Sequence, residues 1–379
     1  MSGIIAHEWI ENTGGAEKVV EAFSELSPNS PLLCLWDDAP GRFHESRVVE
    51  SVIAKTPLRR NKVLALPVMP WVWRRWPKTQ GDWVLISSHL FAHHLRITGN
   101  EEIDRFVYVH TPARYIWEPD LDERGKSAAA RTVAPLLRLL DRQRAQEGGT
   151  YAANSRFVAE RIARCWEIDA QTIYPPVDVA AIQSVADWRD ELSDEDSARL
   201  SGLPDSFILG ASRLVSYKKL DVVIQAGQIT DTPVVIAGEG PDLPRLKAIA
   251  DAARVPVHFM ERTSTALLYA LYQQCLVYVF AGVEDFGIMP VEAMAAGAPV
   301  VGNRVGGVAE TVLDGFSGAL CDPSDGRDLH AALTRAASCD PEISRLQARK
   351  FDVIRFKEEI VEWIGNDRIS GHAEKARKV

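Results

Sequence analysis

The segment EDFGIMPVEAMAAGAPV, residues 284–300, has the pattern of a loop, a short helix and the start of a strand. Pro290 suits the first position of that helix, because the N–H that proline lacks is not needed there and its φ is already helical. Gly297 is expected just past the helix end. Glu284 then lies in the loop before the helix, and Glu292 lies in its first turn. A strand, loop and helix that lead into another strand are typical of parallel α/β sheets.

The same alternation of short β-rich runs and helical patterns continues along the chain. It predicts an α/β protein, and 379 residues are too many for one compact core. We therefore expect two Rossmann-like, doubly wound parallel-sheet domains that face a central cleft, with ligands at the carboxyl ends of the strands. The acidic, serine-rich residues 184–206 lack a sustained apolar period and are the expected joint. The expected domains are residues 1–185 and 186–350, with a final helix in 351–379 that crosses back to the first domain.

The composition excludes several classes of protein. The formal net charge of −9 argues against general nucleic-acid binding. The five cysteines are scattered and lack C-x-x-C spacing, which indicates reduced thiols and no structural zinc site. No basic, apolar leader precedes the first predicted strand, and no apolar run is long enough to span a membrane. These observations predict a cytoplasmic protein.

Cations and glycines follow three of the predicted strands in the second half. The loop GASRLVSYKKLD offers Arg213, Lys218 and Lys219, which could neutralise a diphosphate. A solvated loop is the alternative, since Lys and Arg usually face water. Two glycine pairs mark turns that either approach a ligand closely or only reverse the chain: Gly238 with Gly240, and Gly306 with Gly307.

The two glutamates flank a predicted helix N-terminus, where free backbone N–H groups favour anions. A carboxylate beside a phosphate would repel it, so Glu284 and Glu292 are better suited to accept hydrogen bonds from sugar or ribose hydroxyls. A capping role for Glu292 remains the alternative at this point.

A tryptophan-rich cationic stretch occurs in the first half, where residues 51–80 contain seven cations and no acid. One interpretation is a core helix with solvated charges. The other is a patch that rests on an anionic membrane, because tryptophan favours the interface and each cation adds roughly 1 kcal/mol near the surface. The residues of this predicted membrane or acceptor surface are Trp71, Trp73, Arg74, Arg75 and Trp76.

Taken together, these segments resemble the nucleotide-sugar-dependent glycosyltransferases of family 4, which have the GT-B fold. The resemblance is carried by GASRLVSYKKLD, IAGEGPDLPRL and EDFGIMPVEAMAAGAPVVGNRVGGVAETV in the second half. In the first half it is carried by GGAEKVVEAF, SSHLFAHHL, YVHTPARYIWEP, ANSRFVAERIAR and IYPPVD. The segment YVHTPARYIWEP is most similar to the bacterial mannosyltransferases of O-antigen and polysaccharide assembly. That similarity favours GDP-mannose as the donor.

The resemblance implies roles for the glutamates and the loop between them. Glu284 would contact hydroxyls of the donor sugar, and Glu292 would accept the ribose hydroxyls. The backbone of the intervening loop would close around the sugar, through Asp285, Phe286, Gly287 and Ile288.

The resemblance also implies which groups meet the diphosphate. Arg213 and Lys218 would hold it and steady the leaving group, and Lys219 is the neighbour that would replace Lys218 after a shift of one residue. Gly14 and Gly15, in the first strand-to-helix turn, would let the backbone of the acceptor-binding domain approach the phosphates.

The remaining implied site residues surround the sugar and the base. His110 would lie beside the reacting sugar, although a lone histidine at a strand end is more often structural. Gly238 would line the donor site, and Met260 and Arg262 would lie nearest the base. Here the sequence departs from the family, because Glu261 stands where the family often has glycine.

The implied reaction is retaining transfer of a hexose to a glycan or lipid-linked saccharide, on a protein that is cytoplasmic and peripheral to the inner face of the membrane. No D-x-D pair stands out as a metal site, so protein cations would replace a metal, and the nucleotide sugar is the only small molecule required. A UDP-sugar donor, a sugar-nucleotide epimerase and a non-catalytic partner subunit remain alternatives. A glycoside hydrolase is disfavoured by the phosphate-directed loops. A pyridoxal-phosphate phosphorylase is disfavoured by the short chain and the lack of an evident cofactor lysine.

Overall fold

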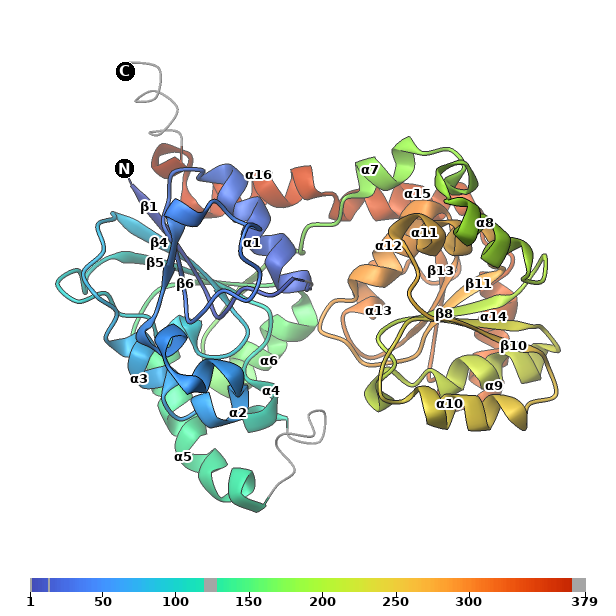
Figure 1. The fold of residues 1–379 in the computed structure, drawn as a ribbon, viewed down its shortest axis with the longest axis horizontal. Coiled ribbons are helices and arrows are strands. Elements are labelled where there is room, and N and C mark those ends of the chain that lie inside the picture. Colours follow the sequence, from blue (N-terminus) through green and yellow to red (C-terminus); the bar gives the residue numbers. More distant parts are fainter. Residues whose placement is uncertain (1, 13, 119–127, 370–379) are drawn as a thin grey trace. The chain divides into compact units, whose positions relative to one another are not determined.

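The computed structural model describes residues 2–12, 14–118 and 128–369. Contacts divide the chain into two units: Met1–Pro176 together with Ile354–Val379, and Val177–Val353. Each unit is an α/β layer structure with a parallel sheet (Figure 1). The boundary between the two units lies after Pro176, whereas the expected boundary lies after residue 185.

The prediction that residues 184–206 form a joint is wrong. They belong to the second unit, where they contain η7 (Trp188–Glu191) and α8 (Asp194–Ser201). Asp196 of α8 accepts a hydrogen bond from the hydroxyl of Ser264 at 2.7 Å, and Arg199 donates to the carbonyl of Glu261 at 2.5 Å. The acidic residues therefore belong to a helix that is anchored by polar contacts. The lack of apolar periodicity in this segment did not indicate such a helix.

The sheet of the first unit has, among the described residues, seven strands in the order β3-β2-β1-β4-β5-β6-β7. Its strands are β1 (Gly3–His7), β2 (Leu32–Cys34), β3 (Val48–Glu50), β4 (Trp83–Ser88), β5 (Asp104–Val109), β6 (Thr150–Ala153) and β7 (Gln171–Thr172). All neighbours pair in parallel. Both β1 and β4 are buried along their full length, as expected of parallel strands covered by helices on both faces.

The α-helices of this unit are α1 (Gly15–Leu26), α2 (Lys62–Ala65), α3 (Met69–Arg74), α4 (Arg114–Trp117), α5 (Ala128–Ala145), α6 (Arg156–Trp166) and α16 (Val353–Ile364). Short 3-10 helices lie between them: η1 (Glu45–Arg47), η2 (Val52–Lys55), η3 (Pro57–Arg60) and η4 (Ala92–His94). The late helix α16 packs here because Phe356 contacts two aromatic rings of the unit. Its ring stacks on Phe23 at 5.9 Å and meets Tyr108 edge-on at 5.7 Å.

The sheet of the second unit has six strands among the described residues, in the order β10-β9-β8-β11-β12-β13, and all are parallel. They are β8 (Ile208–Ala211), β9 (Val234–Ala237), β10 (Val257–Met260), β11 (Val277–Phe280), β12 (Val300–Asn303) and β13 (Gly318–Cys321). Figure 1 shows α9, α10 and α14 on one face of this sheet and α11 and α12 on the other. The predicted α/β class, with two doubly wound parallel sheets, is confirmed.

The remaining helices of the second unit are α7 (Val179–Ser184), α9 (Asp221–Thr230), α10 (Leu243–Asp251), α11 (Thr265–Gln274), α12 (Ile288–Ala296), α13 (Val308–Thr311), α14 (Gly326–Ala336) and α15 (Pro341–Ala348), with η8 (Ser216–Lys218) and η9 (Arg349–Phe351). Helix α12 begins at Ile288, so Pro290 is its third residue and not its first. Glu292 consequently lies in the second turn. Gly297 follows the helix with φ of 105°, as predicted.

The predicted membrane surface is wrong for two of its tryptophans. Trp73 and Trp76 are buried to 0% and 1% exposure, and their rings stack at 5.0 Å. Trp73 lies on the buried face of α3, and Trp76, beyond the end of that helix, forms an isolated β-bridge with Ile97 and packs into the same core. Trp71 is 54% exposed and lies under the guanidinium of Arg75 at 4.8 Å. Arg74 pairs with Glu147.

No helix within the described part of the chain has both the length and the apolar character needed to cross a membrane.

We expect Trp76→Ala to lower the free energy of unfolding by about 3–5 kcal/mol, because it leaves a cavity beside Trp73. Trp71→Ala is the matched control on the same segment, and its effect should stay within about 0.5 kcal/mol. Chemical denaturation followed by circular dichroism would measure both. Equal losses for the two variants would contradict the assignment of Trp76 to the core.

Candidate functional site

Each sheet has one place where the chain direction across the strands reverses. In the second unit it lies between the neighbours β8 and β11, and in the first unit it lies between β1 and β4. Loops after two such strands diverge to opposite sides and leave space at the carboxyl edge, where open α/β sheets bind ligands. The predicted site residues of each unit can be judged against these two edges.

A close ion pair marks the edge of the second unit. The Nζ of Lys218 lies 2.5 Å from Oε1 of Glu284, and both side chains are less than one-fifth exposed at 15% and 18%. Lys218 comes from η8 after β8, whereas Glu284 follows β11. Parallel pairing of β8 with β11 thus brings together two residues that are 66 positions apart in the sequence. Partial burial makes such a pair stronger than one in free solvent.

Two further cations flank this pair on the same loop. Arg213 is exposed and donates from Nη2 to the hydroxyl of Tyr217 at 2.9 Å. Lys219 is exposed and has a left-handed backbone with φ of 53°. The loop therefore presents positive charge at the edge of the sheet, and a diphosphate is the kind of group that it could neutralise.

Glycines let the loops of this edge touch one another. A Cβ on Gly307 would lie 2.4 Å from the carbonyl oxygen of Asp285, and the N–H of Gly307 donates to the carbonyl of Glu284 at 2.8 Å. A Cβ on Gly238 would lie 2.0 Å from the carbonyl oxygen of Ser212. These glycines thus hold the loops that carry Glu284 and Arg213. Close contact between these backbone segments is enough to explain why glycine occupies these positions, without a contact to a ligand.

The loop from Asp285 to Ile288 leads into α12 with a sharp turn. Asp285 and Phe286 are buried, and Gly287 has φ of 91°, a conformation that suits glycine. No side chain among the described residues caps this nine-residue helix. Its first backbone N–H groups therefore face the neighbourhood of Glu284, and such groups favour an anion or an oxygen acceptor.

Glu292 lies one turn further along α12 and is buried to 8% exposure. Burial first, and then the negative charge of Glu292, raise the pKa of Tyr269 well above its ordinary range. The same two causes act on Tyr272, which is fully buried. A carboxylate that faces tyrosines of α11 is held in a defined position and can accept hydroxyl donors.

Met260 and Arg262 lie away from this centre. They follow β10, which is the edge strand and is separated from β8 by β9. Met260 is buried, and Arg262 points to solvent, where its Nε pairs with Glu239 at 3.2 Å. The structure therefore does not bring these two side chains into contact with the Lys218–Glu284 pair.

In the first unit, three side chains form a hydrogen-bonded chain across the carboxyl ends of β1, β4 and β5. Nδ1 of His7 lies 3.0 Å from the hydroxyl of Ser87, and that hydroxyl lies 2.8 Å from Nε2 of His110. His7 is fully buried, and burial is the main reason that its pKa is lowered to about 3. His7 is therefore uncharged at neutral pH.

The geometry of this chain determines where its protons lie. The Nε2 of His7 is buried without a partner among the described residues. A buried N–H without an acceptor costs about 1–3 kcal/mol, so His7 carries its proton on Nδ1 and donates it to Ser87. The Ser87 hydroxyl then donates to Nε2 of His110. Neutral His110 consequently carries its own proton on Nδ1.

The turn after β1 contains Gly14 and Gly15, both exposed. A carboxylate already occupies the adjacent helix N-terminus, because a Cβ on Gly14 would lie 2.0 Å from Oε2 of Glu17. Oε1 of Glu17 accepts the N–H of Glu11 at 3.2 Å. A phosphate that approached these glycines would first have to displace Glu17 or be repelled by it.

Glu8 follows β1 and is fully buried. One of its oxygens, Oε1, accepts the backbone N–H groups of Leu90 and Ala92 at 2.8 and 2.7 Å. Burial raises the pKa of Glu8 from its ordinary value of 4.5 to about 7, although these hydrogen bonds oppose the shift. The carboxyl group therefore fixes the loop after β4, close to Ser87.

A buried group of two histidines and one aspartate anchors the loop after β4 as well. Nε2 of His93 and Nε2 of His94 each lie 3.1 Å from Oδ1 of Asp141, a spacing that a metal could use. The other oxygen of Asp141 accepts the indole N–H groups of Trp117 and Trp166, each at 2.7 Å. Burial raises the pKa of Asp141, but the two histidines outweigh it and hold that pKa below its ordinary range. Three hydrogen-bonded N–H groups, from His94, Trp117 and Trp166, and the close contact with His93 thus surround this carboxylate.

Residues 194–351 match the family model described as glycosyl transferases group 1. This part of the chain is similar to a group 1 glycosyltransferase domain. This finding confirms the predicted resemblance to the family 4-like enzymes, and the matched range lies within the second unit, which carries Lys218, Glu284 and Glu292.

The curated proteins to which this chain is similar include enzymes for mannose and inositol. A GDP-mannose-dependent alpha-(1-6)-phosphatidylinositol monomannoside mannosyltransferase of Mycolicibacterium smegmatis is 29% identical over 212 residues, which are 51% of this chain and 54% of the relative. A D-inositol 3-phosphate glycosyltransferase of Mycobacterium sp. is 29% identical over 231 residues, 56% of this chain and 50% of that one. The serotype-specific mannosyltransferase WbdA of Escherichia coli is 27% identical over 158 residues, 38% and 19%. The chain thus spans about half or less of the length of these relatives.

Solved structures share the fold over nearly the whole chain. Alr3699/HepE of Anabaena, in complex with UDP, has a TM-score of 0.69 and 16% identity and covers 96% of this chain and 99% of its own. WaaG, a glycosyltransferase involved in lipopolysaccharide biosynthesis, has a TM-score of 0.65 and 16% identity and covers 97% and 100%. At these identities the likeness concerns the fold, and it confirms the predicted GT-B architecture.

Sequence reasoning missed His7, Glu8 and Ser87. The signal for them was present, because each stands at the end of a predicted strand, in GIIAHEW or WVLISS. The adjacency of these two strands in the sheet, on which their contact depends, could not be inferred from the sequence positions.

We predict that neutral His110 carries its proton on Nδ1 and that Ser87→Ala abolishes this preference. The variant removes the only hydroxyl that donates to Nε2 in the chain described above. Imidazole ¹⁵N chemical shifts of the labelled protein would report the tautomer of each ring. Ser88→Ala is the matched control: its hydroxyl contacts His93 at 3.2 Å, whereas its backbone carbonyl, which the variant keeps, accepts the N–H of His110. An Nε2-protonated His110 in the wild type would contradict the assignment.

We further predict that Glu8→Gln removes a pH dependence of stability. Since the folded pKa lies above the unfolded one, the folded state binds the extra proton, and stability falls as pH rises from about 4.5 through 7. The variant should gain about 3 kcal/mol relative to wild type on going from pH 4 to pH 8. Denaturant titrations at both pH values would measure it. Glu102→Gln, an exposed position of the same unit, should show no such gain.

Proposed function

We propose that the chain is a retaining hexosyltransferase that moves mannose from GDP-mannose to a glycan or lipid-linked saccharide acceptor. The observation that carries the proposal is the Lys218–Glu284 pair at the carboxyl edge of the sheet, in the part of the chain that is similar to a group 1 glycosyltransferase domain. The GDP-mannose-dependent relative and WbdA support the choice of mannose.

In this proposal the donor separates the ion pair into two productive contacts. Lys218 turns to the diphosphate together with Arg213, with Lys219 as the third cation of the loop. Glu284 accepts hydroxyls of the sugar, and the backbone of Asp285, Phe286, Gly287 and Ile288 closes against it. Glu292 accepts the ribose hydroxyls. Gly238 keeps the Arg213 loop in position, and Met260 and Arg262 lie on the side of the base.

The chemistry follows from where charge develops. Sugar transfer passes through an oxocarbenium-like state while negative charge grows on the departing diphosphate. Arg213, Lys218 and the N-terminus of α12 supply fixed positive charge for that group, and such preorganised stabilisation is often the largest catalytic contribution. Protein cations take the role that a metal has elsewhere. Because no carboxylate nucleophile is evident, we favour front-face transfer, with the leaving phosphate helping to accept the acceptor proton.

The first unit would bind the acceptor. His110, with its proton on Nδ1, would donate a hydrogen bond beside the reacting sugar, and Gly14 and Gly15 would allow backbone approach to the phosphates once Glu17 is displaced. We also propose a cytoplasmic enzyme that is peripheral to the inner face of the membrane. Trp71 and Arg75 are the residues of the original surface that remain exposed for this role.

A UDP-sugar donor is the second candidate, because HepE, which shares the fold, has been solved with UDP. An epimerase on the same fold would turn over the nucleotide sugar without an acceptor. A partner subunit would lack turnover, and the intact set of Arg213, Lys218, Glu284 and Glu292 argues against it.

We predict that GDP binds more tightly than UDP or ADP in calorimetric titrations of the purified protein. Glu292→Gln should weaken GDP binding about tenfold, because the amide replaces a carboxylate acceptor for ribose hydroxyls. Glu284→Gln should leave GDP binding within about twofold and lower transfer from GDP-mannose at least a hundredfold, since its partner is the sugar.

Glu195→Gln is the matched control, as an exposed glutamate of the same unit. Tighter binding of UDP than of GDP would contradict GDP-mannose as the donor and favour a UDP-sugar. Lack of binding by all three nucleotides would overturn the transferase proposal.

A further inference from the structure

A large cationic pocket lies in the first unit, and neither the family nor the proposed donor site accounts for it. Its volume is about 890 Å³, and it is lined by Asp38, Ala54, Lys55, Thr56, Pro57, Arg59, Arg60 and Lys62. Asp38 follows β2, and the remaining lining residues follow β3. Since the strands are parallel, the pocket lies along the same carboxyl edge of the sheet as His7 and His110.

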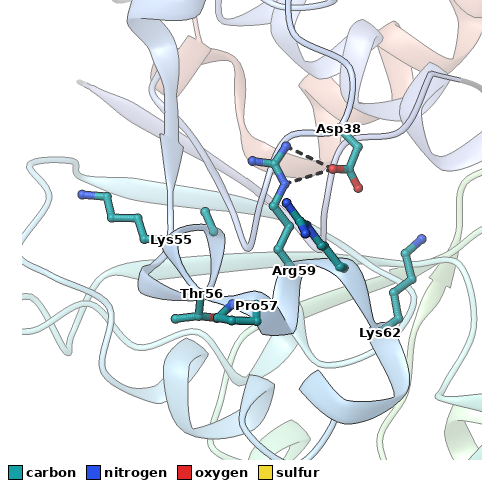
Figure 2. Close-up of a pocket in the computed structure, with 8 residues that line it drawn as sticks. Asp38, Lys55, Thr56, Pro57, Arg59 and Lys62 are labelled. Carbon is teal, nitrogen blue, oxygen red and sulfur yellow. Dashed lines mark hydrogen bonds and ion pairs between the residues drawn. The ribbon is translucent and has the colours of Figure 1, made fainter.

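Two of the four cations in the pocket are already neutralised. The Nη2 of Arg59 lies 3.1 Å from Oδ1 of Asp38, and its Nη1 lies 3.8 Å from Glu50. Lys62 pairs with Glu11. Figure 2 shows the Arg59–Asp38 pair between Lys55 on one side and Lys62 on the other.

The other two cations have no such compensation. Lys55 and Arg60 are exposed, and they belong to none of the ion pairs among the described residues. Residues 51–80 contain no acid that could reach them from the same segment. The pocket thus holds two positive charges that protein groups leave unmatched. A phosphate group, with up to two negative charges and several acceptor oxygens, fits this deficit better than a carboxylate, and the guanidinium fork favours it further.

A series of contacts connects the pocket to His110. Nζ of Lys62 lies 4.4 Å above the centre of the Trp9 ring. Trp9 meets His89 edge-on at 4.9 Å, and the ring of His89 lies 6.3 Å from that of His110. These contacts place the pocket and the end of β5 on either side of one cluster of packed rings.

We propose that this pocket binds a phosphate group of the acceptor, so that the acceptor is a saccharide that carries a phosphate monoester, diester or diphosphate. The proposal rests on the proposed transferase function for the acceptor's role, but the binding of phosphate to the pocket does not. Lys55 and Arg60 are the residues that hold the group, and Lys62 directs the sugar towards Trp9.

The phosphate could belong to a soluble saccharide or to a lipid headgroup. Val63 and Leu64 border the cations and are 58% and 63% exposed, so an acyl chain would meet apolar side chains there. The experiment therefore has a soluble arm and a membrane arm, and both use the same variants.

The soluble arm titrates inorganic pyrophosphate into the Lys218→Gln protein, in which the proposed donor site has lost a diphosphate contact. We expect Lys55→Gln/Arg60→Gln to weaken pyrophosphate binding about tenfold. The matched control is Lys78→Gln/Arg254→Gln, which removes the same charge from exposed positions outside the pocket. The control should bind pyrophosphate like its parent, and melting temperatures should confirm that both variants fold.

The membrane arm measures co-sedimentation with phosphatidylcholine vesicles that contain phosphatidylglycerol. Loss of vesicle binding in the pocket variant alone, together with loss of pyrophosphate binding, assigns the phosphate to a lipid. Unchanged vesicle binding with loss of pyrophosphate binding assigns it to a soluble saccharide. Equal weakening in pocket and control variants, or none in either, would overturn the proposal.

The experiments distinguish failure of the phosphate-pocket proposal from failure of the proposed transferase function. If GDP does not bind, the pyrophosphate titration is still interpretable in the Lys218→Gln background, and only the transferase proposal falls.

Discussion

Parallel strand pairing is the constraint on which the rest of this structure depends. Because each strand pairs in parallel with its neighbours, all carboxyl ends of a sheet lie on one edge, and every loop that follows a strand opens there. Lys218 and Glu284 meet for this reason, and so do His7, Ser87 and His110. The pocket around Lys55 and Arg60 lies on the same edge of its own sheet. Chemistry-bearing side chains that are far apart in sequence are thus collected without any local motif.

Buried polar groups fix the edge of the first unit. Asp141 contacts two histidines and two tryptophans, and Glu8 receives backbone N–H groups of the loop after β4. Such groups are costly to bury unless they are satisfied, so they permit only one arrangement of the loops that they join. The hydrogen-bonded chain to His110 sits on this rigid base. The orientation of these side chains therefore depends on the buried groups of the core as well as on the contacts within the site.

Charge is distributed differently at the two edges. In the second unit Lys218 is compensated by Glu284, and the neighbouring cations Arg213 and Lys219 remain exposed. In the first unit Arg59 and Lys62 are compensated by acids, whereas Lys55 and Arg60 are not. An ion pair can open to admit a ligand of either sign, while unmatched cations select an anion. The same residue types therefore support different kinds of binding at the two edges.

The sequence by itself determined the fold class, the position of α12 between two strands, and the segments that carry the family resemblance. Periodic apolar runs and glycine and proline signals are local, so they survive without tertiary contacts. The roles of Trp73 and Trp76 were decided only by the tertiary structure, because a tryptophan on or just after a short amphipathic helix can face either solvent or core. The packing of residues 184–206 into the second unit, the contact of Ser87 with two histidines and the pairing of Lys218 with Glu284 were decided in the same way. The last two depend on which strands are neighbours, and strand order is not written in the spacing of residues along the chain.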